Sequence, residues 1–129
     1  MGTILIIADN DTIREGLAHT VKRMGHTAVT AKSGAEGLAA FKARGDIDFV
    51  VTDLKMPGMD GVEVLRRLRD IDPLAVIIIM TGYASVETAV RAMKHGAYDY
   101  ITKPFDPDEL SILVRKALEQ RLLKIDNVR

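Results

Sequence analysis

Short apolar runs alternate along this chain with longer segments in which apolar residues recur every three or four positions. The second pattern is typical of amphipathic helices, whereas a short apolar run between turn residues is typical of a buried strand. The candidate strands are 4–7, 27–31, 48–52, 75–80 and 98–101. The candidate helices are 13–24, 33–44, 62–71, 86–97 and 107–125. The pattern therefore predicts five consecutive strand–helix units.

This alternation predicts an α/β domain. Sequential strand–helix units form a mostly parallel sheet with helices on both faces. The run at 48–52 is apolar in its centre, as expected of a strand that is covered on both sides. In doubly wound folds of this kind, ligands bind outside the carboxyl ends of the strands. The residues that follow each strand are therefore the first candidates for chemistry.

Composition excludes several kinds of protein. The 129 residues suffice for one domain with a single core. Because 18 Lys and Arg residues balance 18 Asp and Glu residues, charge gives no basis for direct nucleic-acid or membrane binding. The chain lacks Cys and its three His residues lack metal-ligand spacing, so a metal would be held mainly by oxygen. No apolar run approaches the roughly 20 residues of a membrane helix, and no signal peptide is visible, which favours the cytoplasm.

Polar residues stand at the ends of four candidate strands. Asp9 follows the first strand, Asp53 the third and Thr81 the fourth, and Lys103 lies just beyond the fifth. Carboxylates suit a divalent cation such as Mg²⁺, while a Lys and a Thr hydroxyl can contact phosphoryl oxygens. A carboxylate that accepts a phosphoryl group needs both, because a cation reduces charge repulsion and donors stabilise the oxygens. The set favours a phosphoryl group carried on a carboxylate.

Three motifs resemble the receiver domain of bacterial two-component response regulators. They are VTDLKMPGMDG at 51–61, MTG at 80–82 and ITKPF at 101–105, in the family's order and spacing. GAYDY at 96–100 is most similar to the nitrogen-regulation class of transcription activators. The resemblance implies a single flavodoxin-like (βα)5 domain with a parallel five-stranded sheet of order 2-1-3-4-5. We therefore expect a receiver domain over 1–119 and an extension of the last helix over 120–129.

The resemblance also implies a phosphoryl acceptor and a cofactor. Asp53 would take a phosphoryl group from a histidine kinase. Mg²⁺ would be bound by Asp9, Asp53 and the backbone carbonyl of Lys55. The implied chemistry is limited to self-phosphorylation and self-dephosphorylation, so the chain is not expected to be an enzyme in the usual sense.

A switch is implied by the same resemblance. Thr81 would contact the phosphoryl group and move on activation, and Lys103 would pair with that group from a cis Lys103–Pro104 peptide. The ring of Tyr100 would follow Thr81, and would change the surface formed by the fourth helix, the fifth strand and the fifth helix. That surface would control homodimerisation or an output domain. In the nitrogen-regulation class, an ATPase domain and a DNA-binding domain usually follow the receiver.

Ala8 departs from the family pattern. Receivers normally place two acidic residues after the first strand, and those positions hold Ala8 and Asp9 here. In the family, the first acid acts on the metal chiefly through water. We therefore expect Ala8 to weaken Mg²⁺ binding more readily than to abolish it. Asp11 either reaches the metal and compensates, or caps the first helix.

The end of the last helix has two interpretations. Leu122, Leu123 and Ile125 continue its apolar stripe beyond the part needed to cover the sheet. This stripe is either an overhanging end that frays or a linker helix that pairs with a partner or a second copy, and we favour the linker slightly.

Two other functions compete with a phosphorylated receiver. Ala8 favours a pseudo-receiver, a binding module of the same fold that works without phosphorylation, although the retained Asp53 argues against it. The sequence DND at 9–11 approximates the Asp-x-Asp signature of haloacid-dehalogenase-type phosphatases, but Ile13 stands where that family has Thr or Val. The phosphatase would use Asp9 as its nucleophile, whereas the receiver would use Asp53.

Overall fold

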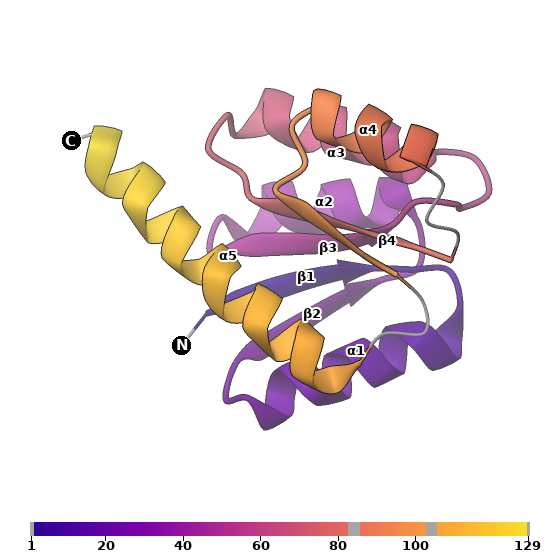
Figure 1. Cartoon of the computed structure of the whole chain (residues 1–129), viewed down its shortest axis with the longest axis horizontal. Coiled ribbons are helices and arrows are strands. Elements are labelled where there is room, and N and C mark those ends of the chain that lie inside the picture. Colours follow the sequence, from indigo (N-terminus) through magenta and orange to yellow (C-terminus); the bar gives the residue numbers. More distant parts are fainter. Residues whose placement is uncertain (1, 83–85, 103–105, 129) are drawn as a thin grey trace.

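The structure is a computed structural model that describes residues 2–82, 86–102 and 106–128. Strands and helices alternate along the chain, as the hydrophobic pattern predicts (Figure 1). The strands are β1 (Thr3–Ile7), β2 (Thr27–Ala31), β3 (Phe49–Asp53), β4 (Ile77–Thr81) and β5 (Asp99–Thr102). The helices are α1 (Asp11–Arg23), α2 (Gly34–Arg44), α3 (Gly61–Ile71), α4 (Val86–Lys94) and α5 (Pro107–Val128).

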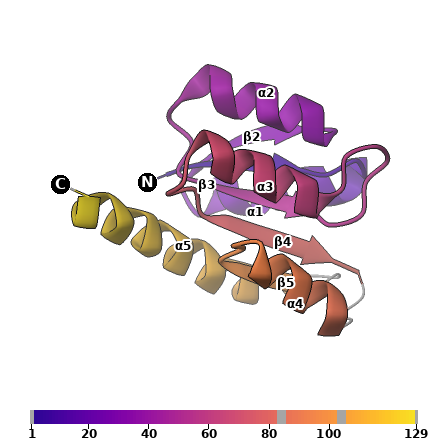
Figure 2. The ribbon, with the colours of Figure 1, turned by 90° about the horizontal axis from the view of Figure 1, so that it is seen from above.

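The strands form one parallel sheet of order β2-β1-β3-β4-β5, which confirms the predicted flavodoxin-like topology. Ile7 pairs with Thr52, and Asp53 pairs with Met80. Helices α1 and α5 cover one face of the sheet and α2, α3 and α4 cover the other, as Figure 2 shows from above. This register places the carboxyl ends of β1, β3 and β4 side by side, along the edge of the sheet where the strands end.

Each face of the sheet has its own apolar layer. Alternate residues of β1 belong to different layers: Ile4 and Ile6 pack towards α1 and α5, and Leu5 and Ile7 towards α2 and α3. Strands β3 and β4 are buried along their whole length, as expected for central strands of a parallel sheet. Edge strand β2 is partly exposed. Within the part of the chain described, no helix combines the length and apolar character that crossing a membrane requires.

Some element ends differ from the prediction. Strands β3 and β4 include Asp53 and Thr81 as their last residues, so these side chains belong to the strands and do not follow them. Helix α4 ends at Lys94, before the predicted 97, and Gly96 then adopts a left-handed conformation with φ of 99°. Buried Ala97 continues the apolar period beyond the helix, which is why the sequence pattern overran it.

His26 makes the stability of the fold depend on pH. Its Nδ1 accepts a hydrogen bond of 3.0 Å from the backbone N–H of Gly2, which requires a neutral ring. Burial lowers the pKa of His26 below its ordinary value of 6.5, and the charge of Asp48 opposes this shift. The folded protein therefore binds fewer protons here than the unfolded chain. This contribution to the free energy of unfolding is present above pH 6.5 and is lost as the pH falls from 6.5 towards the lowered pKa.

We expect the melting temperature to fall over this pH interval, and to fall less in His26→Asn, whose side chain does not titrate. Thermal unfolding followed by circular dichroism at a series of pH values measures this. The control is His19→Asn, at an exposed position of α1, which should keep the wild-type profile. Identical profiles for the wild type and His26→Asn would contradict the assignment.

Candidate functional site

Three of the predicted site residues lie at one edge of the sheet. Asp53 is the last residue of β3 and is only 2% exposed. Thr81 is the last residue of the adjacent strand β4 and is also buried. Asp9 lies two residues after β1, on the other side of β3, and is exposed. Because the strands are parallel and adjacent, their carboxyl ends bring these side chains to the same region.

The turn after β3 orients the Asp53 carboxylate. The N–H of Leu54 donates to the carbonyl of Met80 over 2.8 Å, so β3 stays attached to β4 as the chain turns. The N–H of Lys55 then donates to Oδ1 of Asp53 over 3.3 Å. A buried carboxylate requires hydrogen-bond partners, and this backbone donor is one of them. The N–H of Lys55 therefore orients the Asp53 carboxylate, and the N–H of Leu54 holds the turn in place.

Gly61 lies at the end of the same turn and packs against the backbone of Asp53. Its N–H donates to the carbonyl of Leu54 over 2.8 Å, and the preceding Asp60 caps α3 by accepting from the N–H of Glu63 over 2.9 Å. A Cβ atom at Gly61 would lie 2.4 Å from the backbone oxygen of Asp53. In the sequence, Gly61 was identified only as part of the motif at 51–61. The signal that could have singled it out is a glycine directly after the helix cap Asp60, at the end of the turn that begins with Asp53.

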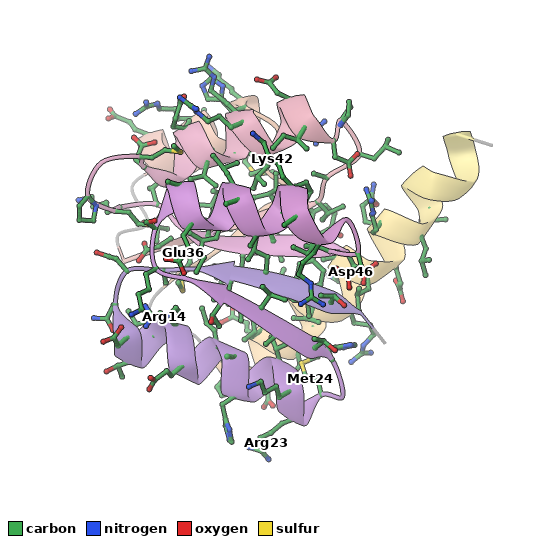
Figure 3. All side chains as sticks on the ribbon, turned by 180° about the vertical axis from the view of Figure 1, so that it is seen from behind. Arg14, Arg23, Met24, Glu36, Lys42 and Asp46 are labelled. Atoms are coloured by element: carbon green, nitrogen blue, oxygen red, sulfur yellow. The ribbon has the colours of Figure 1, made fainter. Side chains whose placement is uncertain are left out.

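Arg14 fixes the end of β1 and was not predicted. It is buried, and its Nη1 donates to the carbonyl of Ala8 over 2.9 Å. The same guanidinium forms an ion pair with the carboxylate of Asp11, and this hydrogen bond and the positive charge lower the pKa of Asp11. Figure 3 shows Arg14 and Glu36 at the same end of the molecule, opposite Met24 and Asp46.

The ion pair corrects the prediction for Asp11. Asn10 is the N-cap of α1, since its side-chain oxygen accepts from the N–H of Ile13 over 3.0 Å. Asp11 is the first residue of the helix, and its carboxylate is engaged by Arg14. The interpretation of Asp11 as the cap is therefore wrong.

The donor set at this edge fits a hard cation with few protein ligands. Within the described residues, no group of three or more His, Cys, Asp or Glu side chains is arranged to hold a metal. This agrees with a methyl group at position 8, where a receiver normally has an acid. Mg²⁺ binds oxygen, keeps several waters and often uses only one or two carboxylates. Asp9, Asp53 and the backbone carbonyl of Lys55 are oxygen donors of the kind that Mg²⁺ prefers, and their joint role as ligands stays a prediction.

The other predicted site residues lie on or after β5. Tyr100 lies within β5, opposite Ile79 of β4, and is 40% exposed. Lys103 and the Lys103–Pro104 peptide fall outside the described residues, so their predicted roles and cis geometry stay predictions.

Comparisons with known proteins agree on one family. The chain matches the response regulator receiver domain over residues 4–115. It is 41% identical over 123 residues to the regulatory protein AtoC of Escherichia coli, with 94% of this chain and 26% of that protein covered. It is 37% identical over 117 residues to the DNA-binding transcriptional regulator NtrC of Escherichia coli, with 91% and 25% covered.

A solved structure gives the same result. The receiver domain protein of Clostridium thermocellum superimposes with a TM-score of 0.91 at 36% identity, with 95% of this chain and 98% of that chain covered. The chain thus spans about a quarter of the curated relatives it matches and nearly all of an isolated receiver domain. Strand order, strand-end residues and relatives together place the chain in the response regulator receiver domain family of two-component systems, with relatives in the nitrogen-regulation class.

Proposed function

We propose that this chain is a signalling switch in which a histidine kinase donates a phosphoryl group to Asp53. One observation carries the proposal. Asp53 is a buried carboxylate at the end of a central strand, held by the N–H of Lys55 and adjacent to Thr81 on the next strand. The fold does not require a buried acid at the edge where doubly wound sheets bind ligands. Its presence there therefore favours a chemical role for Asp53.

The transfer is a displacement at phosphorus. A carboxylate oxygen of Asp53 forms the new O–P bond while the N–P bond of the kinase phosphohistidine breaks, and the imidazole leaves with the electron pair. The Thr81 hydroxyl and the Lys103 ammonium donate to phosphoryl oxygens. Mg²⁺, when bound, would supply positive charge that reduces repulsion between the carboxylate and the phosphoryl group. Asp9, Asp53 and the carbonyl of Lys55 would hold the ion.

The readout is the surface formed by α4, β5 and α5. Tyr100 is partly exposed there, and α4 and α5 add exposed apolar side chains at Val90, Met93 and Ile112. Exposed apolar side chains on these three consecutive elements favour contact with a protein partner. A change at Thr81 shifts the population of Tyr100 rotamers and so the affinity of this surface for a second copy or for an output domain. By analogy with the longer relatives, the output is an ATPase domain and a DNA-binding domain.

Intact-mass spectrometry tests the proposal directly. The protein is incubated with acetyl phosphate, with and without Mg²⁺, and the modified residue is located by borohydride reduction and peptide sequencing. We expect one added phosphoryl group that requires Mg²⁺ and lies on Asp53. A group on Asp9 would instead support the phosphatase. No adduct with several donors at high Mg²⁺ would support the pseudo-receiver that Ala8 favours.

Ala8→Asp is expected to tighten Mg²⁺ binding about tenfold, the effect of one added negative charge roughly 6 Å from a divalent ion in a water-like dielectric. Ala8 is fully buried and directly follows β1, and its backbone carbonyl accepts from the guanidinium of Arg14, so a positive charge lies close to the new carboxylate. Calorimetric titration with Mg²⁺ measures the affinity. Thr30→Asp, which adds the same charge at an exposed position of β2, is the control. Unchanged affinity in Ala8→Asp would contradict the assigned role of position 8.

A further inference from the structure

Arg121 attaches the C-terminal part of α5 to the body of the domain. It lies beyond residue 115, where the match to the receiver family ends. Its Nη1 donates to the backbone carbonyl of Leu74 and contacts Oδ2 of Asp72, each over 3.0 Å. The Arg121 side chain is only 18% exposed, whereas Leu122 and Leu123 are 64% and 58% exposed. Among the side chains described, Arg121 is therefore the last one of α5 held by the domain.

The loop that Arg121 contacts is itself well fixed. Asp72 uses Oδ1 to accept the N–H of Leu74 over 2.9 Å, and its backbone carbonyl accepts the N–H of Ala75 over 2.9 Å. This leaves Oδ2 for Arg121. One carboxylate therefore both shapes the loop between α3 and β4 and holds the last helix.

A second arginine holds the same loop from the other side. Nη1 of Arg69 donates to the carbonyl of Ala75 over 3.2 Å and to that of Gly96 over 3.5 Å. Gly96 precedes β5, the strand that carries Tyr100. A Cβ atom at Gly96 would lie 3.0 Å from the Arg69 side chain, so the two pack closely. The α3–β4 loop thus connects the end of α5 with the turn that leads into β5.

The Arg121 contact also has a cost. Nε of Arg121 is buried and has no hydrogen-bond partner. It borders a cavity of about 190 Å³ between the ends of α2, α3 and α5. A buried N–H without an acceptor opposes the closed arrangement, while the two contacts of Nη1 favour it. The net contribution of the contact to stability is therefore smaller than the two contacts of Nη1 alone would give.

We propose that the contacts of Arg121 with Asp72 and Leu74 are a latch that sets the direction in which α5 leaves the domain. With the latch closed, the segment after residue 121 continues the receiver as one rigid helix. With the latch open, Leu122 and Leu123 can reorient and pair elsewhere. The latch lies at the amino end of β4, whereas Asp53 lies at the carboxyl ends of the strands, so the latch acts on α5 from outside the candidate site. The proposal does not depend on phosphorylation.

Hydrogen–deuterium exchange on the whole chain tests the latch. Asp72→Asn keeps a side-chain oxygen for the N–H of Leu74 but removes the charge that faces Arg121. We expect the amides of 122–128 to exchange about fivefold faster relative to those of 107–118, the size of effect of one partly exposed ion pair. Asp70→Asn removes the same charge from an exposed position near the end of α3 and should leave this ratio unchanged.

A second pair of variants removes the guanidinium itself. Arg121→Met is expected to raise the same ratio, and Arg115→Met, at an exposed position of α5, is expected not to. Three results would overturn the latch: wild-type amides of 122–128 that already exchange at the unprotected rate, equal changes in latch and control variants, or acceleration spread evenly over α5. The ratio within one helix separates opening of the latch from a general loss of stability.

Discussion

Asp53→Asn is expected to reduce phosphorylation by acetyl phosphate at least about 10³-fold, because an amide cannot replace a carboxylate nucleophile. The fold should persist, since Asn keeps the side-chain oxygen that accepts the N–H of Lys55. Intact mass as a function of time gives the rate. Circular dichroism and denaturant unfolding show whether the variant is folded. Phosphorylation that survives in folded Asp53→Asn would refute the acceptor assignment.

Substitutions at two further acids separate phosphoryl acceptance from Mg²⁺ binding. Asp9→Asn should lower the rate mainly by raising the Mg²⁺ concentration required, so high Mg²⁺ should restore much of it. Asp46→Asn is the control. Asp46 is exposed and lies at the end of the molecule opposite Arg14, so this substitution should leave the rate unchanged. Loss in Asp9→Asn that no Mg²⁺ concentration rescues would mean that Asp9 does more than hold the ion.

Gly61→Ala is expected to lower the free energy of unfolding by about 3 kcal/mol and to slow phosphorylation strongly. The new Cβ would lie 2.4 Å from the backbone oxygen of Asp53 and 2.8 Å from Cα of Leu54. Both are backbone atoms in the turn that positions the acceptor, so relief requires the turn itself to move. Urea unfolding measures the stability, and intact mass measures the phosphorylation rate.

Gly37→Ala is the matched control for this substitution. Its Cβ would lie 2.3 Å from Cδ1 and 2.6 Å from Cγ1 of Ile7, equally short distances, but both atoms belong to a side chain. A side chain can shift where a backbone turn cannot, and alanine gains about 1 kcal/mol of helix propensity over glycine within α2. We therefore expect a smaller loss of stability and a normal phosphorylation rate. Similar phosphorylation defects in both variants would contradict the special position of Gly61.

The elements of this fold could be predicted because burial and hydrophobic period agree over most of the chain. Strand β2 was predicted with its observed ends, since polar residues flank it on both sides. Strands β3 and β4 each extend to a polar residue, Asp53 and Thr81, which a hydrophobic pattern excludes from a strand. The convergence of Asp9, Asp53 and Thr81 could be predicted because the carboxyl ends of adjacent parallel strands lie together, whereas their chemical roles stay predictions.

The contacts of Arg14 and Arg121 could not be predicted, for a physical reason. A charged residue in an amphipathic pattern is assigned to the exposed face, yet Arg14 is buried because the carbonyl of Ala8 and the carboxylate of Asp11 satisfy it. Arg121 contacts Leu74, 47 positions earlier in the chain. Such a contact depends on how the elements pack, and a local sequence pattern contains no information about it.

The division of the molecule into a buried core and a row of strand-end residues has an evolutionary consequence. The apolar layers consist of residues such as Leu5 and Ile6, which take no part in the site, while Asp9 is exposed and adds little to the core. Under the proposed function, a mutation of Asp9 changes metal affinity or signalling while the apolar layers that keep the domain folded are untouched. Selection can act on such a variant for function alone. Ala8 is fully buried in the apolar layer beside α1, so the core accepts a methyl group where a receiver normally has an acid.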